Sequence, residues 1–78
     1  MHYLLKLFTT SHCHLCELAH ELVSQHRDGH ELQCVEITDS ERLLEAYGPR
    51  VPVLQRTDTL TELDWPFDKD DIQRFLET

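Results

Sequence analysis

The chain has 78 residues, of which 40% are hydrophobic and 28% are charged, so we expect a single domain with one modest core. Its seven Lys and Arg and fifteen Asp and Glu give a net charge of −8 at pH 7. This balance argues against binding to nucleic acid or to an anionic membrane surface, because both partners select for basic patches.

No apolar run in the sequence approaches the ~20 residues that a membrane-spanning helix needs. The N-terminal stretch MHYLLKLF is short, contains Lys6 and has no small-residue cleavage site. We therefore expect no signal peptide and a cytoplasmic protein. Three cysteines in such a chain argue against a structural disulfide framework.

The first half of the chain predicts a strand, a helix and a second strand. Residues 3–8 are a short apolar run typical of a buried strand, and residues 31–37 read as the second strand, with Cys34 as a small buried residue. Between them, residues 14–27 have the apolar spacing of a helix with one buried face. The residues on that face are Leu15, Leu18, Ala19, Leu22 and Val23.

The second half predicts a helix, two strands and a final helix. Asp39 or Ser40 can cap a short helix that ends at residues 48–49, and residues 50–56 and 60–65 form a hairpin. Asp68 opens the last helix, which has acidic residues in its first turn. The predicted fold is therefore α/β with the order β-α-β-α-β-β-α, a four-stranded mixed sheet flanked by three helices.

Cys13 and Cys16 form a C-x-x-C pair where the first predicted helix begins. The first N–H groups of a helix have no partner inside the helix and favour negative charge, and the thiolate is the nucleophilic form of cysteine. We predict that Cys13 is the nucleophile and that the helix terminus, with His12 or His14, lowers its pKa. Cys16 lies on the same side of the helix as the resolving thiol. The pair in a β-α-β unit is typical of thioredoxin-type redox chemistry.

Three features together resemble the glutaredoxins of the thioredoxin superfamily: the C-x-x-C pair, Val51-Pro52 and the order of elements. Small bacterial glutaredoxin-like proteins also have YG.R.PVL and LDWPFD stretches similar to residues 47–54 and 63–68. In that family the matching proline is cis and faces the cysteine pair. The resemblance thus implies that Pro52 shapes the wall beside Cys13 and that Val51 offers backbone groups to a substrate.

The resemblance also implies that glutathione is held poorly. Ordinary glutaredoxins have a basic residue before the first cysteine, a threonine two residues before the cis-proline, and a Gly-Gly turn before the last helix. Residues 9–12 and 63–68 lack the first and third features, and Arg50 replaces the threonine. Arg50, His12 and His14 join Val51 and Pro52 as candidate substrate-binding residues.

We accordingly expect a monomeric thiol–disulfide oxidoreductase with no tightly bound cofactor. Its substrate would be a disulfide-containing protein or a thiol compound, and glutathione or a reductase would donate electrons. Two other functions stay open. One is a zinc or copper site around Cys13, Cys16 and the nearby histidines, although no second ligand pair exists in the sequence. The other is a thioredoxin-like adaptor with idle cysteines. His2, His26 and His30 are expected on the surface.

Overall fold

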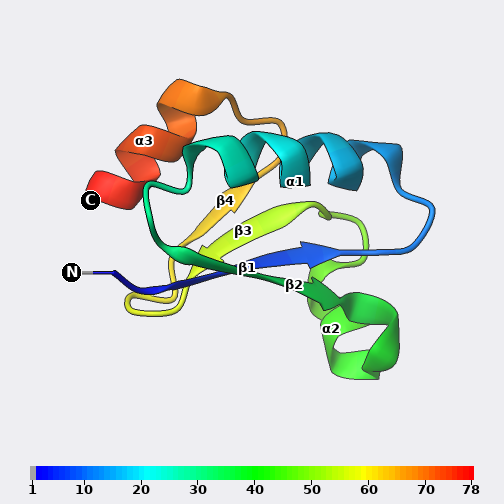
Figure 1. The fold of residues 1–78 in the computed structure, drawn as a ribbon. Coiled ribbons are helices and arrows are strands. Elements are labelled where there is room, and N and C mark those ends of the chain that lie inside the picture. The colour runs from blue at the N-terminus through cyan, green and yellow to red at the C-terminus, as the bar shows by residue number, and fades with distance from the viewer. Residues whose placement is uncertain (1) are drawn as a thin grey trace.

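The computed structural model describes residues 2–78 and contains one four-stranded sheet with helices on both faces (Figure 1). In chain order the elements are β1 (Leu4–Thr9), α1 (His14–His26), β2 (Glu31–Glu36), the 3-10 turn η1 (Ile37–Asp39), α2 (Glu41–Tyr47), β3 (Val53–Arg56), β4 (Glu62–Asp64) and α3 (Lys69–Glu77). The strand order is β2-β1-β3-β4, with β1 parallel to β2 and antiparallel to β3, and with β3 antiparallel to β4. The predicted fold class is confirmed.

Alternating side chains of the central strands divide the core into two layers. On one face, Leu5, Leu7 and Leu54 are fully buried beneath α1 and α3. The other buried members of this layer are Ala19, Val23, Phe67, Ile72 and Phe75. This layer fixes α1 across the sheet, and α1 carries the cysteine pair at its N-terminus (Figure 1).

The opposite face has a smaller cluster formed by Phe8, Ile37 and Val53. The ring of Tyr47, at the end of α2, stacks on Phe8 with the ring centroids 4.1 Å apart. Val51 packs against the same cluster. The connection from α2 to β3 is therefore held against the end of β1, immediately before the chain turns into α1.

Two predicted helix starts are confirmed by hydrogen bonds. The side chain of Ser40 accepts from the backbone N–H of Leu43 at the start of α2. At α3, Asp68 and Asp71 each accept from the other's backbone N–H, which is the reciprocal capping box. Such caps satisfy amide groups that the helix itself cannot pair, so they fix where each helix begins.

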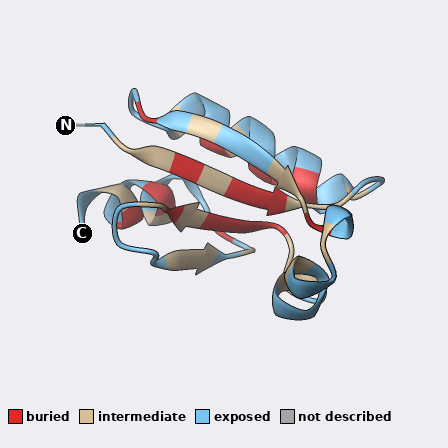
Figure 2. Ribbon diagram, turned by 90° about the horizontal axis from the view of Figure 1, so that it is seen from below, coloured by how far each residue is buried: buried red, intermediate tan, exposed pale blue. Residues whose placement is uncertain are grey.

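The structure contradicts three burial predictions (Figure 2). Leu15 and Leu18 are 47% and 42% exposed. The buried face of α1 begins at Cys16 and leaves both leucines on the solvent side of the helix. Cys34 is exposed, because it lies on β2, an edge strand with little cover. His30 is buried, since its ring stacks on Tyr3 and its Nδ1 accepts from the Tyr3 backbone N–H.

Across residues 2–78, every helix is too short or too polar to cross a bilayer.

Candidate functional site

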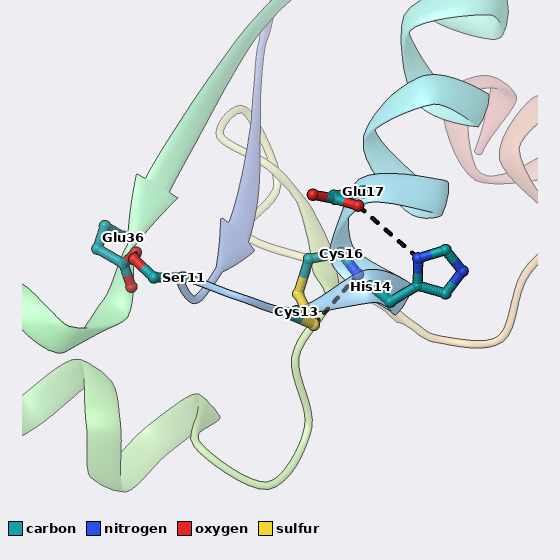
Figure 3. The surroundings of a disulfide bond; sticks show 6 residues. All are labelled: Ser11, Cys13, His14, Cys16, Glu17 and Glu36. Atoms are coloured by element: carbon teal, nitrogen blue, oxygen red, sulfur yellow. Dashed lines mark hydrogen bonds and ion pairs between the residues drawn. A yellow bond between two sulfur atoms is a disulfide. The ribbon is translucent and has the colours of Figure 1, made fainter.

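The cysteine pair lies where the chain leaves β1 and enters α1 (Figure 3). His12 has a left-handed backbone conformation, with φ of 59°, and Cys13 then takes the N-cap position of the helix. Cys13 and Cys16 are joined as a disulfide, with their Cα atoms 5.2 Å apart, inside the usual range for this bond. The turn after β1 therefore places both sulfur atoms at the first turn of α1.

The environment of the two sulfur atoms differs. Cys13 is partly exposed, and its Sγ accepts a hydrogen bond from the backbone N–H of Cys16 at 3.2 Å. Cys16 is only 4% exposed and belongs to the buried side of α1. An incoming group can thus approach Cys13 from solvent, while Cys16 is shielded behind it.

A pocket of about 350 Å³ opens beside the pair. It is lined by Thr9, Thr10, Ser11, His12, Cys13, Cys16, Glu17, His20 and Cys34. The N-cap Cys13 and the α1 residues of this set have the i, i+3, i+4 and i+7 spacing of one helix face, and Cys34 reaches the pocket from β2. The pocket therefore joins the loop after β1, one flank of α1 and the edge of the sheet.

One acidic residue, Glu17, lines this pocket, and a second, Glu36, contacts the lining residue Ser11 (Figure 3). The side chain of Glu17 is 79% exposed, and its carboxylate lies 3.7 Å from the Nδ1 of His14. On the other side, the hydroxyl of Ser11 donates to Glu36 at 2.8 Å. That hydrogen bond holds the pKa of the Glu36 carboxyl below its usual value, so Glu36 stays charged. Among the described residues that line the pocket there is no Lys or Arg.

Arg50 is held by two acidic side chains of β4. Its guanidinium lies 2.8 Å from Glu62 and 2.8 Å from Asp64, and it sits over the ring of Tyr47. Hydrogen bonding to Asp64 and Glu62 raises the pKa of Arg50, and the bond from Arg50 lowers the pKa of Asp64. Burial, followed by the hydrogen bond to Glu62, raises the pKa of Tyr47 to about 12. The positive charge of Arg50 is therefore compensated within this cluster.

The Val51–Pro52 peptide bond is cis. The backbone N–H of Val51 donates to the carbonyl of Tyr47 at 3.0 Å, so this donor is already paired. Pro52 is fully buried, and its carbonyl accepts from the N–H of Trp65 at 3.2 Å. These bonds fasten the entrance of β3 to the end of α2 and to the segment between β4 and α3.

The structure brings together only part of the residue set expected from sequence. Cys13, Cys16 and His12 share the pocket, whereas Arg50, Val51 and Pro52 do not line it. His14 is exposed and contacts Glu17.

Sequence reasoning missed Glu17 and Cys34 as pocket residues and considered His20 only for a metal. The helical spacing from Cys13 could have identified Glu17 and His20. Cys34 is the register partner of Leu7, and that pairing across the sheet has no local signal in the sequence. Partial burial raises the pKa of the Cys34 thiol. In the described part of the chain, no three His, Cys, Asp or Glu side chains are grouped to hold a metal ion.

The comparisons with known proteins agree with this geometry. The family model described as "Glutaredoxin-like domain (DUF836)" matches residues 4–77. The crystal structure of protein XcR50 from X. campestris is 42% identical, with a TM-score of 0.83, and the match covers 94% of this chain and 95% of that one. The solution structure of protein Ne2328 from Nitrosomonas europaea is 32% identical, with a TM-score of 0.76, covering 96% and 92%. No curated protein matches the chain.

Proposed function

Because this chain belongs to the glutaredoxin-like domain family, we propose that it is a thiol–disulfide oxidoreductase that works through Cys13 and Cys16. One observation carries the proposal. Cys13 is partly exposed at the N-cap of α1 and accepts a backbone hydrogen bond, while its disulfide partner Cys16 is buried. This is the asymmetry that a nucleophilic and a resolving thiol require.

The reaction starts from the reduced dithiol. The Cys13 thiolate attacks one sulfur of a substrate disulfide, forms a mixed disulfide and releases the other half of the substrate as a thiolate. The Cys16 thiolate then attacks the Sγ of Cys13 and expels the second half. Two electrons pass to the substrate, the released thiolates take up protons, and the Cys13–Cys16 disulfide remains. A reductant, either glutathione or a reductase, returns the protein to its dithiol form.

The substrate would lie against Cys13 and the cis Val51–Pro52 bond, with His12 at the pocket side. The Val51 N–H is paired with Tyr47, so its carbonyl is the backbone group that we assign to the substrate. His14 is exposed enough to contact a bound chain. The charge of Arg50 is compensated by Glu62 and Asp64, which supports weak glutathione binding. The protein would act as a monomer in the cytoplasm, without a tightly bound cofactor.

A turnover assay tests this function. The purified chain is supplied with a disulfide such as insulin and, in separate reactions, with glutathione plus glutathione reductase or with a thioredoxin reductase system. We expect NADPH consumption that depends on the protein in at least one system and is lost in Cys13→Ser. Equal rates for the parent chain and Cys13→Ser in both systems would instead favour an adaptor with idle cysteines.

A further inference from the structure

We propose that the site selects substrate disulfides that are flanked by positive charge and disfavours anionic ones, with Glu17 as the specificity residue. This inference rests on the proposed redox function and concerns the class of substrate. It arises from the charge around the pocket beside Cys13: Glu17 lines the pocket, Glu36 is hydrogen-bonded to its lining residue Ser11, and the described lining residues include no Lys or Arg.

Glu17 is the source of this selectivity. It lines the pocket together with Cys13 and Cys16, and its side chain is 79% exposed, so a bound substrate can reach it. Glu36 adds a second carboxylate behind Ser11, whose hydroxyl lines the same pocket and donates to it. The Cys13 thiolate of the reduced protein adds a third negative charge. A cationic side chain next to the substrate cysteine would meet only favourable charges here.

Arg50, which directly precedes Val51, does not offset these negative charges. Arg50 donates to Asp64 from both Nε and Nη2, at 3.1 and 2.8 Å, and to Glu62 at 2.8 Å. Two carboxylates around one guanidinium leave this cluster with a net negative charge. Both the pocket and the Arg50 cluster are thus unfavourable for a substrate with carboxylates next to its disulfide.

The test uses three symmetric disulfide dimers of the peptide acetyl-X-Cys-X-amide, in which X is Lys, Gln or Glu. The reduced protein is mixed with each dimer at about pH 8, where imidazole is neutral. The reaction is quenched with acid, and the rate constant for reduction is measured by mass spectrometry. Each value is divided by that for dithiothreitol, a neutral reductant, because flanking charges also change the intrinsic reactivity of the disulfide.

Two unit charges about 6 Å apart in water change a rate about threefold, so exchanging Lys for Glu should change the normalised rate by roughly tenfold. We expect the order Lys, Gln, Glu, and a contrast that mostly disappears at about 1 M NaCl, where the screening length is ~3 Å. Because the Lys dimer gains and the Glu dimer loses about threefold against one such charge, Glu17→Gln should reduce the Lys-to-Glu ratio by roughly tenfold.

Glu77→Gln is the matched control, because Glu77 lines a different pocket, with Gln25 and His26, at the C-terminal end of α1. This variant removes the same formal charge and should leave the ratio unchanged. Equal or reversed normalised rates for the Lys and Glu dimers would overturn the selectivity while leaving the redox function standing. Failure to reduce any of the three dimers would contradict the redox function itself.

Discussion

The backbone N–H of Cys16 points at the Sγ of Cys13 and lies 3.2 Å from it. Cys13 is the N-cap of α1, so its sulfur occupies the place where a helix usually receives a capping oxygen. A thiolate at this position gains from the unpaired amides of the first turn and from the helix dipole. The same contact thus accounts for the start of the helix and for the reactivity expected of the thiol.

The pKa of Cys13 in the reduced protein should therefore lie below the ~8.5 of a free cysteine, by about one unit for each ~1.4 kcal/mol of preference for the thiolate. The measurement is thiolate absorbance against pH in a Cys16→Ser, Cys34→Ser double variant, in which Cys13 is the remaining cysteine. A Cys13 pKa at or above that of free cysteine would show that the helix terminus does not activate this thiol.

Cys34 should be the single thiol that reacts with iodoacetamide in the oxidised protein, because it is exposed and outside the disulfide. Burial raises its pKa, so its thiolate fraction at neutral pH is small, and alkylation should be slower than for free cysteine. Intact mass against time, at several pH values, gives the rate. Cys34→Ser is the control and should take up no label; rapid labelling at neutral pH would contradict the account.

Arg56 should stabilise the fold far more than a surface arginine does. Its buried guanidinium donates to the carbonyl of Phe75 at 2.8 Å, pairs with Asp58 and sits over the ring of Tyr3. Arg56→Met would leave the Asp58 partner and the last carbonyls of α3 without their donor, at an expected cost of about 3 kcal/mol in the free energy of unfolding.

Arg74→Met is the comparison for this prediction, because Arg74 forms an exposed pair with Asp71 on α3. Loss of this ion pair should lower the free energy of unfolding by less than about 0.5 kcal/mol. Urea unfolding of both variants gives the two values. Similar losses in the two variants would mean that Arg56 does not anchor the C-terminal helix.

The buried His30 predicts a loss of stability in mild acid. Burial lowers its pKa in the folded protein, and its Nδ1 accepts from the Tyr3 N–H, which requires the neutral ring. The unfolded chain then binds a proton more readily than the folded one. The stabilisation by neutral His30 is therefore fully present above ~6.5, the pKa of histidine in the unfolded chain. This stabilisation is lost as the pH falls from ~6.5 toward the lower pKa of His30 in the folded protein.

Thermal unfolding of the parent chain and of His30→Gln between about pH 5 and 7.5 tests this contribution. The parent should lose more stability than His30→Gln across that interval, since the substituted side chain does not titrate there. Parallel curves for the two proteins would contradict the assignment of the effect to His30.

The sequence was sufficient for the order of elements because each element has a local signal. The capping pair Asp68 and Asp71 and the N-cap Ser40 act within one turn, and the short apolar run of β1 is typical of a buried strand. The C-x-x-C pair is equally local, so its position at the start of α1 was predictable from spacing and helix periodicity.

The surroundings of the pair depend on contacts between distant segments, which no local pattern contains. The exposure of Cys34 follows from β2 being an edge strand, and the burial of His30 follows from its stack on Tyr3. Arg50 was expected to bind substrate, and its pairing with β4 had no local signal because those partners are at least twelve residues away in sequence. Register across the sheet decides such pairings, and it is set only when the whole domain packs.

Trapping the mixed disulfide distinguishes Cys13 from Cys16 as the attacking thiol. Reduced Cys16→Ser and Cys13→Ser proteins, each also carrying Cys34→Ser, are incubated with a small excess of the Lys-flanked peptide dimer, and their intact masses are measured. We expect a stable adduct of one peptide on the protein that retains Cys13. On the protein that retains the buried Cys16, the adduct should be absent or form at least tenfold more slowly. Equal adduct formation on both proteins, or adduct only through Cys16, would contradict this assignment.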